Sequence, residues 1–189
     1  MFQSVSRFIL KSLGWKMVGE LPRERKYIII VGPHTSNWDF ILGMIVRSAM
    51  GVKVRFLAKH QLFHAPYGWF FRWLGGSPVH RHKDNNLVDQ VVAMYENNDD
   101  FILGIAPEGT RSETKRWKSG FYHIAAKANV PIGMIGFDFK SKEVRFREAF
   151  WPTGDIDADF PVILDYFRGV DGCHPKVIPQ HIPAEKVSN

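Results

Sequence analysis

Residues 26–49 read KYIIIVGPHTSNWDFILGMIVRSA, and this stretch decides the fold class. Residues 26–32 form a continuous apolar run, which is typical of a strand covered on both faces. Pro33 ends the strand, because proline lacks the N–H that a central strand needs. A second apolar run, residues 37–49, follows with a helical pattern. The stretch therefore predicts a strand, a short polar loop and a helix.

The rest of the chain continues this alternation. Further strands are expected at 53–58, 77–81, 101–106, 131–139 and 143–150. Helices are expected at about 37–49, 61–73, 85–97, 117–128 and 158–168. The last two strands flank Lys140-Ser141-Lys142 and can form a hairpin. The pattern predicts a single α/β domain whose mostly parallel or mixed central sheet is flanked by helices.

Composition limits the partners. The chain has 189 residues, a formal net charge of +6 and a pI of about 9.5, which favours anionic partners over the alternative of a soluble protein with spare lysines. It lacks any run of five consecutive basic residues, so no nucleic-acid-binding tail is expected. The single cysteine, Cys173, has no internal disulfide partner, which fits a reducing compartment.

Residues 1–25 are treated as a separate N-terminal region, and residues 26–189 as the main domain. No apolar stretch reaches the ~18 residues of a membrane-spanning helix. Apolar residues recur at helical spacing near the start of the chain, and basic residues lie outside that stripe. Such a helix lies in a membrane interface or packs on the protein's own core, and both readings stay open. The apolar positions are Phe2, Val5, Phe8, Ile9 and Leu13; the basic ones are Arg7, Lys11 and Lys16.

His34 and Asp39 admit two interpretations. Ser36 followed three residues later by Asp39 matches a capping box, in which the carboxylate only secures the start of a helix. Alternatively, His34 lies on the loop and Asp39 folds back toward it from the first helical turn. A carboxylate that accepts a hydrogen bond from one imidazole nitrogen leaves the other nitrogen free to act as a base on a hydroxyl.

A second polar segment, PEGTRS at residues 107–112, also follows an apolar strand. Its arginine, Arg111, can bind a phosphate through two parallel hydrogen bonds. Between the two segments, residues 56–81 are rich in aromatic residues, include Lys59 and end on Arg81. In open α/β sheets, ligands bind where strands end and helices begin, so both segments are candidates for one site.

Four ordered motifs resemble those of the lysophospholipid acyltransferases, the family related to 1-acyl-glycerol-3-phosphate acyltransferase. The first, H-x-x-x-x-D, is matched by His34 and Asp39. The third, P-E-G-T-R-S, is matched letter for letter by residues 107–112, and the start of the fourth is matched by residues 130–132. The second motif is matched at Phe56, Lys59, Pro66, Gly68, Gly75 and Arg81. The resemblance covers about residues 26–140.

The resemblance implies transfer of a fatty acyl group from an acyl thioester to the hydroxyl of a lysophospholipid, as in phospholipid biosynthesis. His34 would be the general base and Asp39 would orient it. Arg81 and Arg111 would bind the acceptor's phosphate, unless they form ordinary surface ion pairs. Lys59 would assist with phosphate or pantetheine, or is simply solvated. The residues implied to line the head-group site are Glu108, Gly109 and Thr110.

The expected partners are the lysophospholipid, the acyl thioester (acyl-CoA or acyl-carrier protein) and a membrane surface, with the protein peripheral on the cytoplasmic face of the cell membrane. No cofactor and no metal are expected. His60 and His64 have zinc-ligand spacing, but Gln61 stands where a zincin has its glutamate. Two alternatives stay open: an aminolipid or glycolipid acceptor, and a non-catalytic lipid-binding protein.

Overall fold

The computed structural model describes residues 2–64, 66–79 and 87–180 and contains one seven-stranded mixed sheet. The strand order is β1-β7-β6-β2-β5-β3-β4. The strands are β1 (Lys16–Val18), β2 (Lys26–Gly32), β3 (Val54–Lys59), β4 (Gly76–Val79), β5 (Phe101–Ile105), β6 (Ile132–Asp138) and β7 (Glu143–Phe150). The mixed central sheet and the single α/β domain confirm the predicted fold class.

The strands β4, β3, β5, β2 and β6 are parallel to one another, and the antiparallel pairing joins β6 to β7 toward one edge of the sheet. Strand β2 pairs in parallel with β5 on one side and with β6 on the other, and β3 joins β5 to β4. The predicted hairpin is present, because β6 and β7 pair antiparallel. Since β2 and β5 are parallel neighbours, the loops that follow them emerge at the same edge of the sheet.

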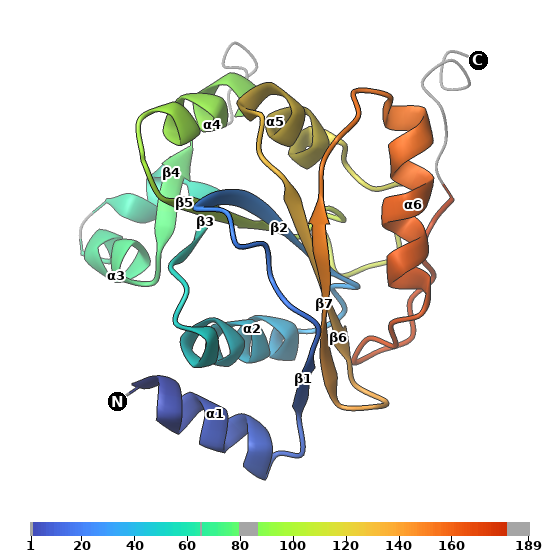
Figure 1. Ribbon diagram of the computed structural model, residues 1–189. Helices are drawn as coiled ribbons and strands as arrows, with labels where there is room; N and C mark the ends of the chain where they lie inside the picture. Colours follow the sequence, from blue (N-terminus) through green and yellow to red (C-terminus); the bar gives the residue numbers. More distant parts are fainter. Residues whose placement is uncertain (1, 65, 80–86, 181–189) are drawn as a thin grey trace.

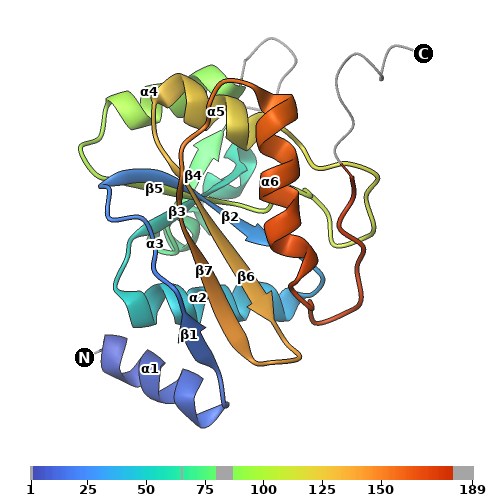
Figure 2. The same cartoon turned by 45° about the vertical axis from the view of Figure 1, so that its right-hand side comes forward.

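Helices cover both faces of the sheet (Figures 1 and 2). One face carries α1 (Phe2–Ser12) and α2 (Asn37–Met50), and the other carries α4 (Leu87–Glu96), α5 (Gly120–Ala128) and α6 (Ile156–Arg168). The short α3 (Gly68–Trp73) lies beside the β4 edge. Each layer of helices buries its own apolar cluster against the sheet, so the strands have few exposed side chains, as their continuous apolar sequences predicted.

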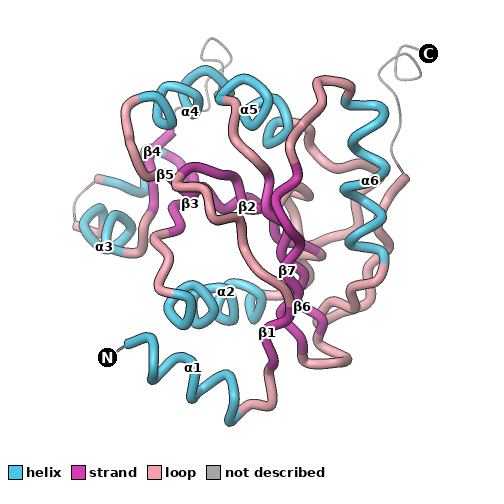
Figure 3. The backbone as a smooth tube through the Cα atoms, in the orientation of Figure 1, coloured by secondary structure: helices cyan, strands magenta, loops and turns pink. Residues whose placement is uncertain are grey.

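Alternate residues of β2 divide the core into these two layers. Ile28 and Ile30 pack with α4, α5 and α6, whereas Tyr27 and Ile29 pack with α1 and α2. This division follows from the alternation of side chains along a strand. The tube drawing in Figure 3 shows the sheet between the helical layers.

Two elements of the structure differ from the sequence prediction. The helix expected over residues 61–73 is divided into the 3₁₀ helix η1 (His60–Phe63) and α3. Pro66 lacks the N–H that a continuous helix needs, and a Cβ on Gly68 would lie 2.1 Å from the carbonyl oxygen of Phe63. Strand β1 was not predicted, because its three side chains are exposed and show no alternation.

The N-terminal helix is confirmed, and the structure shows which way its apolar stripe faces. The α1 residue Leu10 is buried in the core, while Phe2 and Phe8 are 81% and 70% exposed. Val5, Ile9 and Leu13 are exposed as well. The helix is attached to α2 through its polar side, since the Arg7 guanidinium donates to the carbonyl of Ala49. Among the described residues, no helix has both the length and the apolar character needed to cross a bilayer.

Candidate active site

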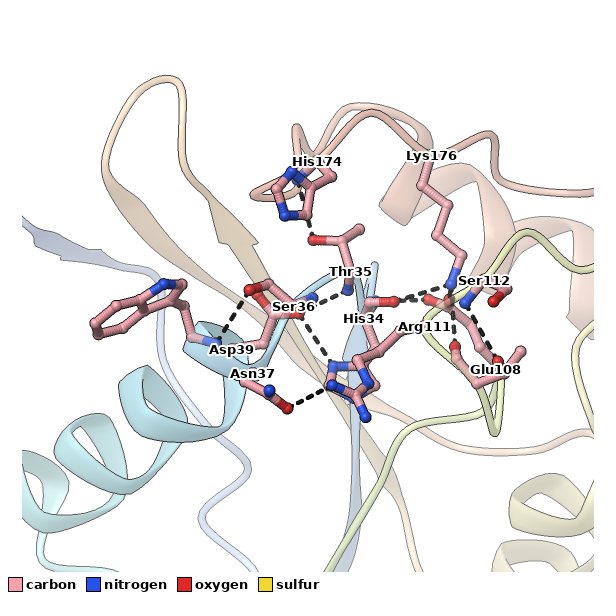
Figure 4. Close-up of polar contacts among 12 residues, drawn as sticks. His34, Thr35, Ser36, Asn37, Asp39, Glu108, Arg111, Ser112, His174 and Lys176 are labelled. Atoms are coloured by element: carbon pink, nitrogen blue, oxygen red, sulfur yellow. Dashed lines mark hydrogen bonds and ion pairs between the residues drawn. The ribbon is translucent and has the colours of Figure 1, made fainter.

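Two loops from neighbouring strands build the site. Residues 33–36 follow β2 and lead into α2, and residues 106–112 follow β5. The pairing of Ile30 with Ile105 brings the ends of the two strands together. The two polar segments, residues 33–39 and the PEGTRS segment at 107–112, therefore meet at one edge of the sheet (Figure 4).

Asp39 both caps the helix and orients the histidine. Ser36 is the N-cap of α2, and the complete capping box is present. The Asp39 Oδ2 atom accepts hydrogen bonds from the backbone N–H groups of Thr35 at 2.6 Å and Ser36 at 2.8 Å. The same oxygen lies 3.0 Å from the Nδ1 atom of His34. The two interpretations of this residue pair are thus parts of one arrangement.

These contacts fix the protonation of the pair. Burial by itself would raise the pKa of Asp39, but the hydrogen bonds from His34, Ser36 and Thr35 outweigh it, so the pKa of the carboxyl lies below its ordinary value. An ionised carboxylate only accepts, so Nδ1 of His34 carries the proton and Nε2 has the free lone pair. Nε2 has no hydrogen-bond partner among the described residues, and the His34 side chain is 27% exposed while Asp39 is 4% exposed.

The PEGTRS loop (residues 107–112) also contacts residues 33–36, which we call the histidine loop. The backbone N–H of His34 donates to Oε1 of Glu108 at 2.8 Å. The Glu108 carboxylate is buried and points into the protein, whereas Gly109 and Thr110 are exposed. Gly109 has φ of +67°, a left-handed conformation that favours glycine. The loop therefore turns its carboxylate inward and its next two residues outward.

Arg111 lies at the mouth of the site. Its guanidinium donates to Oδ1 of Asn37 at 2.5 Å, and its side chain is exposed. Both residues border the cavity that His34 also lines. Asn37 was not predicted as a site residue, although it stands between His34 and Asp39 in the same short segment.

Two further site residues, Lys59 and Arg81, were predicted from the resemblance. Lys59 is the last residue of β3, and its side chain is not described. Arg81 lies outside the described residues. Their implied roles in binding phosphate or pantetheine stay predictions.

An apolar cavity of about 450 Å³ extends from His34 beneath α2. Its walls come from α2 on one side and from β2, β3, β5 and β6 on the other. The polar and charged residues that border the cavity are His34, Asn37, Asp39, Arg47, Arg55 and Arg111. The apolar walls include Phe40, Gly43, Met44, Met50, Val54, Phe56, Ile135 and Phe137. The His34 imidazole, which is 27% exposed, thus lies between solvent and an apolar cavity.

One residue of the site gave no signal in the sequence. Lys176 belongs to the segment after α6, and its side chain is 3% exposed. Its ammonium donates to the carbonyl of His34 at 2.9 Å and to the carbonyl of Thr110 at 3.1 Å, and it forms a buried ion pair with Glu108. The segment has no hydrophobic period, so only the fold brings Lys176 to residues far away in the sequence (Figure 4).

The His60–His64 pair is close, with ring centroids 5.0 Å apart. Within the described ranges, no group of three or more His, Cys, Asp or Glu side chains is arranged to hold a metal ion.

Comparison with known proteins places this chain in a family. The model of the acyltransferase family matches residues 16–137, which is more than half of the chain. The chain therefore belongs to the acyltransferase family. No curated protein matches it.

A solved structure has the same fold. The chain is similar to the crystal structure of the 1-acyl-sn-glycerophosphate (LPA) acyltransferase PlsC from Thermotoga maritima, with a TM-score of 0.58 and 18% sequence identity. The match covers 89% of this chain and 76% of that chain. At this identity the similarity establishes the fold.

Proposed function

We propose that this acyltransferase transfers a fatty acyl group from an acyl thioester to the hydroxyl group of a lysophospholipid such as 1-acyl-glycerol-3-phosphate. The observation that carries the proposal is the His34–Asp39 pair, 3.0 Å apart, at the mouth of an apolar cavity. The T. maritima protein with the same fold is a 1-acyl-sn-glycerophosphate acyltransferase, which supports this acceptor class.

In this mechanism His34 is the general base. Its Nε2 atom takes the proton of the acceptor hydroxyl as the hydroxyl oxygen attacks the thioester carbonyl. Asp39 holds the ring in the required tautomer and stabilises the imidazolium. When the carbon–sulfur bond breaks, the imidazolium returns the proton to the leaving thiolate, so the transfer needs no covalent enzyme intermediate and no role for Cys173.

The apolar cavity is suited to the fatty acyl chain. It begins at His34, so a chain that enters it would leave its carbonyl carbon beside the imidazole. Burial of each methylene contributes about 0.8 kcal/mol, and a chain of fatty-acid length therefore binds strongly in such a space.

Arg111 is the proposed ligand of the acceptor's phosphate. Its guanidinium is exposed at the same mouth, and its hydrogen bond to Asn37 keeps it beside His34. A planar guanidinium can donate two parallel hydrogen bonds to a phosphate. This position would bring the glycerol hydroxyl of the acceptor toward Nε2 of His34.

We also propose that the protein binds the cytoplasmic face of the cell membrane peripherally. Large apolar side chains are exposed on and just after α1, at the start of α2, and on and just before α3: Phe2, Val5, Phe8, Leu13, Trp38, Phe40, Ile41, Tyr67, Trp69, Phe70 and Trp73. Phe40 is half exposed and also lines the cavity, so the cavity opens beside this apolar surface. Aromatic and aliphatic side chains of this kind favour a bilayer interface.

The activity can be tested by mass spectrometry of the products. Purified protein would be incubated with each pairing of a donor (acyl-CoA or acyl-carrier protein) and a vesicle-borne acceptor, including lysophosphatidate, other lysophospholipids and aminolipids. We expect a diacyl product from at least one lysophospholipid. A product only from aminolipids would overturn the acceptor class, and no product from any pairing would contradict the proposed reaction.

A further inference from the structure

We propose that Lys176 is a positioning residue, which locks the histidine loop to the PEGTRS loop and sets the charge around His34. This inference rests on the proposed function, and it concerns a segment beyond the residues 16–137 that the family model matches. We refer to residues 170–180, which follow α6, as the C-terminal strap.

The strap lies directly on the histidine loop. The backbone N–H of His174 donates to the Thr35 hydroxyl at 3.2 Å. A Cβ on Gly172 would approach Thr35 to 2.7 Å and Pro33 to 3.1 Å, so the close packing requires glycine at this position. The backbone N–H of Phe139, just after β6, donates to the carbonyl of Asp171 at 2.8 Å and attaches the strap to the sheet. These contacts fix the position of the strap against the histidine loop.

Lys176 connects both catalytic loops with one ammonium group. Its three acceptors are the His34 carbonyl, the Thr110 carbonyl and the Glu108 carboxylate, which also accepts from the backbone N–H of His34. An ammonium has three protons, so these partners use all of them. The group is consequently not available to a substrate, and its effect on catalysis must pass through the residues that it holds.

The Lys176–Glu108 ion pair also balances charge beside His34. The charged or titratable groups around His34 come from three elements: Asp39 from α2; Glu108 and Arg111 from the loop after β5; and His174 and Lys176 from the strap, with Arg47 and Arg55 farther along the cavity. Removing the Lys176 charge leaves Glu108 as a buried, uncompensated anion, which stabilises the imidazolium form of His34. Removing the Glu108 charge alone would have the opposite effect.

The test uses three variants: Lys176→Met, Glu108→Gln and the double variant. Glutamine keeps an oxygen that accepts from the His34 N–H, so the double variant is free of buried unpaired charge and remains testable if Lys176→Met does not fold. The control is Lys140→Met, because Lys140 pairs with Asp171 of the same strap at 3.8 Å, and both side chains are largely exposed. The readouts are kcat, acceptor KM and the titration of the His34 imidazole by NMR, with its signal assigned by its loss in His34→Gln.

We expect Lys176→Met to lower kcat by about 10- to 100-fold, the scale of a misplaced catalytic group. The His34 titration should move to higher pH by about half to one pH unit, move to lower pH in Glu108→Gln and return near the wild-type value in the double variant. Because the contacts to the two carbonyls are still missing, the double variant should stay slow. Lys140→Met should match the wild type.

Two outcomes would overturn the inference. One is a wild-type kcat in Lys176→Met or in the double variant. The other is a His34 titration that does not respond to either charge. If the wild-type protein transfers no acyl group at all, the proposed function fails, whereas the NMR titration still tests whether Lys176 and Glu108 control His34.

Discussion

Two buried aspartates, Asp39 and Asp159, accept hydrogen bonds from backbone N–H groups near helix starts on opposite faces of the sheet. Of the two, Asp39 belongs to the candidate active site. Each is 4% exposed and lies in the first turn of a helix. Asp39 accepts from the backbone N–H groups of Thr35 and Ser36, and Asp159 accepts from that of Thr153 at 2.7 Å.

The difference lies in the side-chain donor. Asp159 accepts from the Tyr122 hydroxyl at 2.8 Å, and burial together with this hydrogen bond raises the pKa of Tyr122 to about 12. That phenol is buried and keeps its proton. Asp39 accepts from the imidazole of His34, a partly exposed residue that also lines the cavity. A buried carboxylate therefore indicates chemistry only when its partner has a second, accessible proton site.

The matched substitutions Asp39→Asn and Asp159→Asn should separate the two roles most strongly. Asp39→Asn removes the charge that stabilises the imidazolium and the correct tautomer, so kcat should fall on the order of 10²- to 10⁴-fold. Asp159→Asn should leave the kcat of the folded protein unchanged. Steady-state kinetics with melting curves would measure both, and equal effects of the two variants on kcat would contradict a specific role of Asp39 in the reaction.

Both variants should also lose stability. Weakening the hydrogen bonds of a buried carboxylate costs about 1–3 kcal/mol. Urea unfolding of each variant, followed by circular dichroism, would measure this loss. An Asp39→Asn protein as stable as the wild type would contradict the capping role of the carboxylate.

Arg111→Lys should have an intermediate effect. An ammonium lacks the planar pair of donors, so the acceptor KM should rise about tenfold, equivalent to about 1.4 kcal/mol, with little change in kcat. The control is Arg168→Lys, since Arg168 forms an exposed pair with Asp165 on α6. An unchanged acceptor KM in Arg111→Lys would argue against the phosphate role.

Gly43→Leu should change the choice of donor by a few fold per methylene. Gly43 lines the cavity, and a Cβ there would lie 3.6 Å from the Phe137 ring, so alanine fits and leucine fills the space. Each methylene that no longer binds loses about 0.8 kcal/mol, which favours shorter acyl chains. Rates with donors of graded chain length would measure the shift. If Gly43→Leu keeps the wild-type chain preference, the cavity does not hold the acyl chain.

The smallest effects should appear in the pH dependence of stability, in acid for Asp39 and in alkali for Tyr122. The folded-state pKa of Asp39 is lowered, so its stabilisation is present above the ordinary carboxyl pKa and is lost as pH falls through the folded value. The pKa of Tyr122 is raised from 10.0 to about 12, so its stabilisation is complete below pH 10 and is lost as pH rises toward 12.

Unfolding free energies would be compared between the wild type and the variants Asp39→Asn and Tyr122→Phe across this range. The difference for Asp39→Asn should shrink only in acid, and the difference for Tyr122→Phe should shrink only in alkali. A difference that shrinks at the wrong end for either variant would contradict the assigned protonation state.

The sequence predicted the features that local pattern controls. Continuous apolar runs located β2, β5 and β6, and the capping box with its histidine located the start of α2. The parallel pairing of β2 with β5 brings the two polar loops together, as expected for an α/β sheet. The prediction of one helix over residues 61–73 is wrong, because Pro66 interrupts the helix that the periodic pattern indicates.

The strap could not have been predicted in the same way. Lys176 is an ordinary lysine in a segment without periodicity, and its meaning depends on packing against residues that lie more than sixty positions away in the sequence. The orientation of α1 was also open, because an amphipathic pattern does not say whether the apolar side meets the protein or the solvent. Leu10 alone turns inward, and the wider apolar stripe faces out.

The most direct measurement is the acyl-transfer rate of purified His34→Ala, compared with His123→Ala as a control, because His123 is an exposed residue of α5. We predict that His34→Ala loses essentially all transfer, at least about 10²-fold, while its melting temperature stays near that of the wild type and His123→Ala keeps the normal rate. A folded His34→Ala protein that transfers acyl groups at the wild-type rate would contradict the role of this imidazole as the general base.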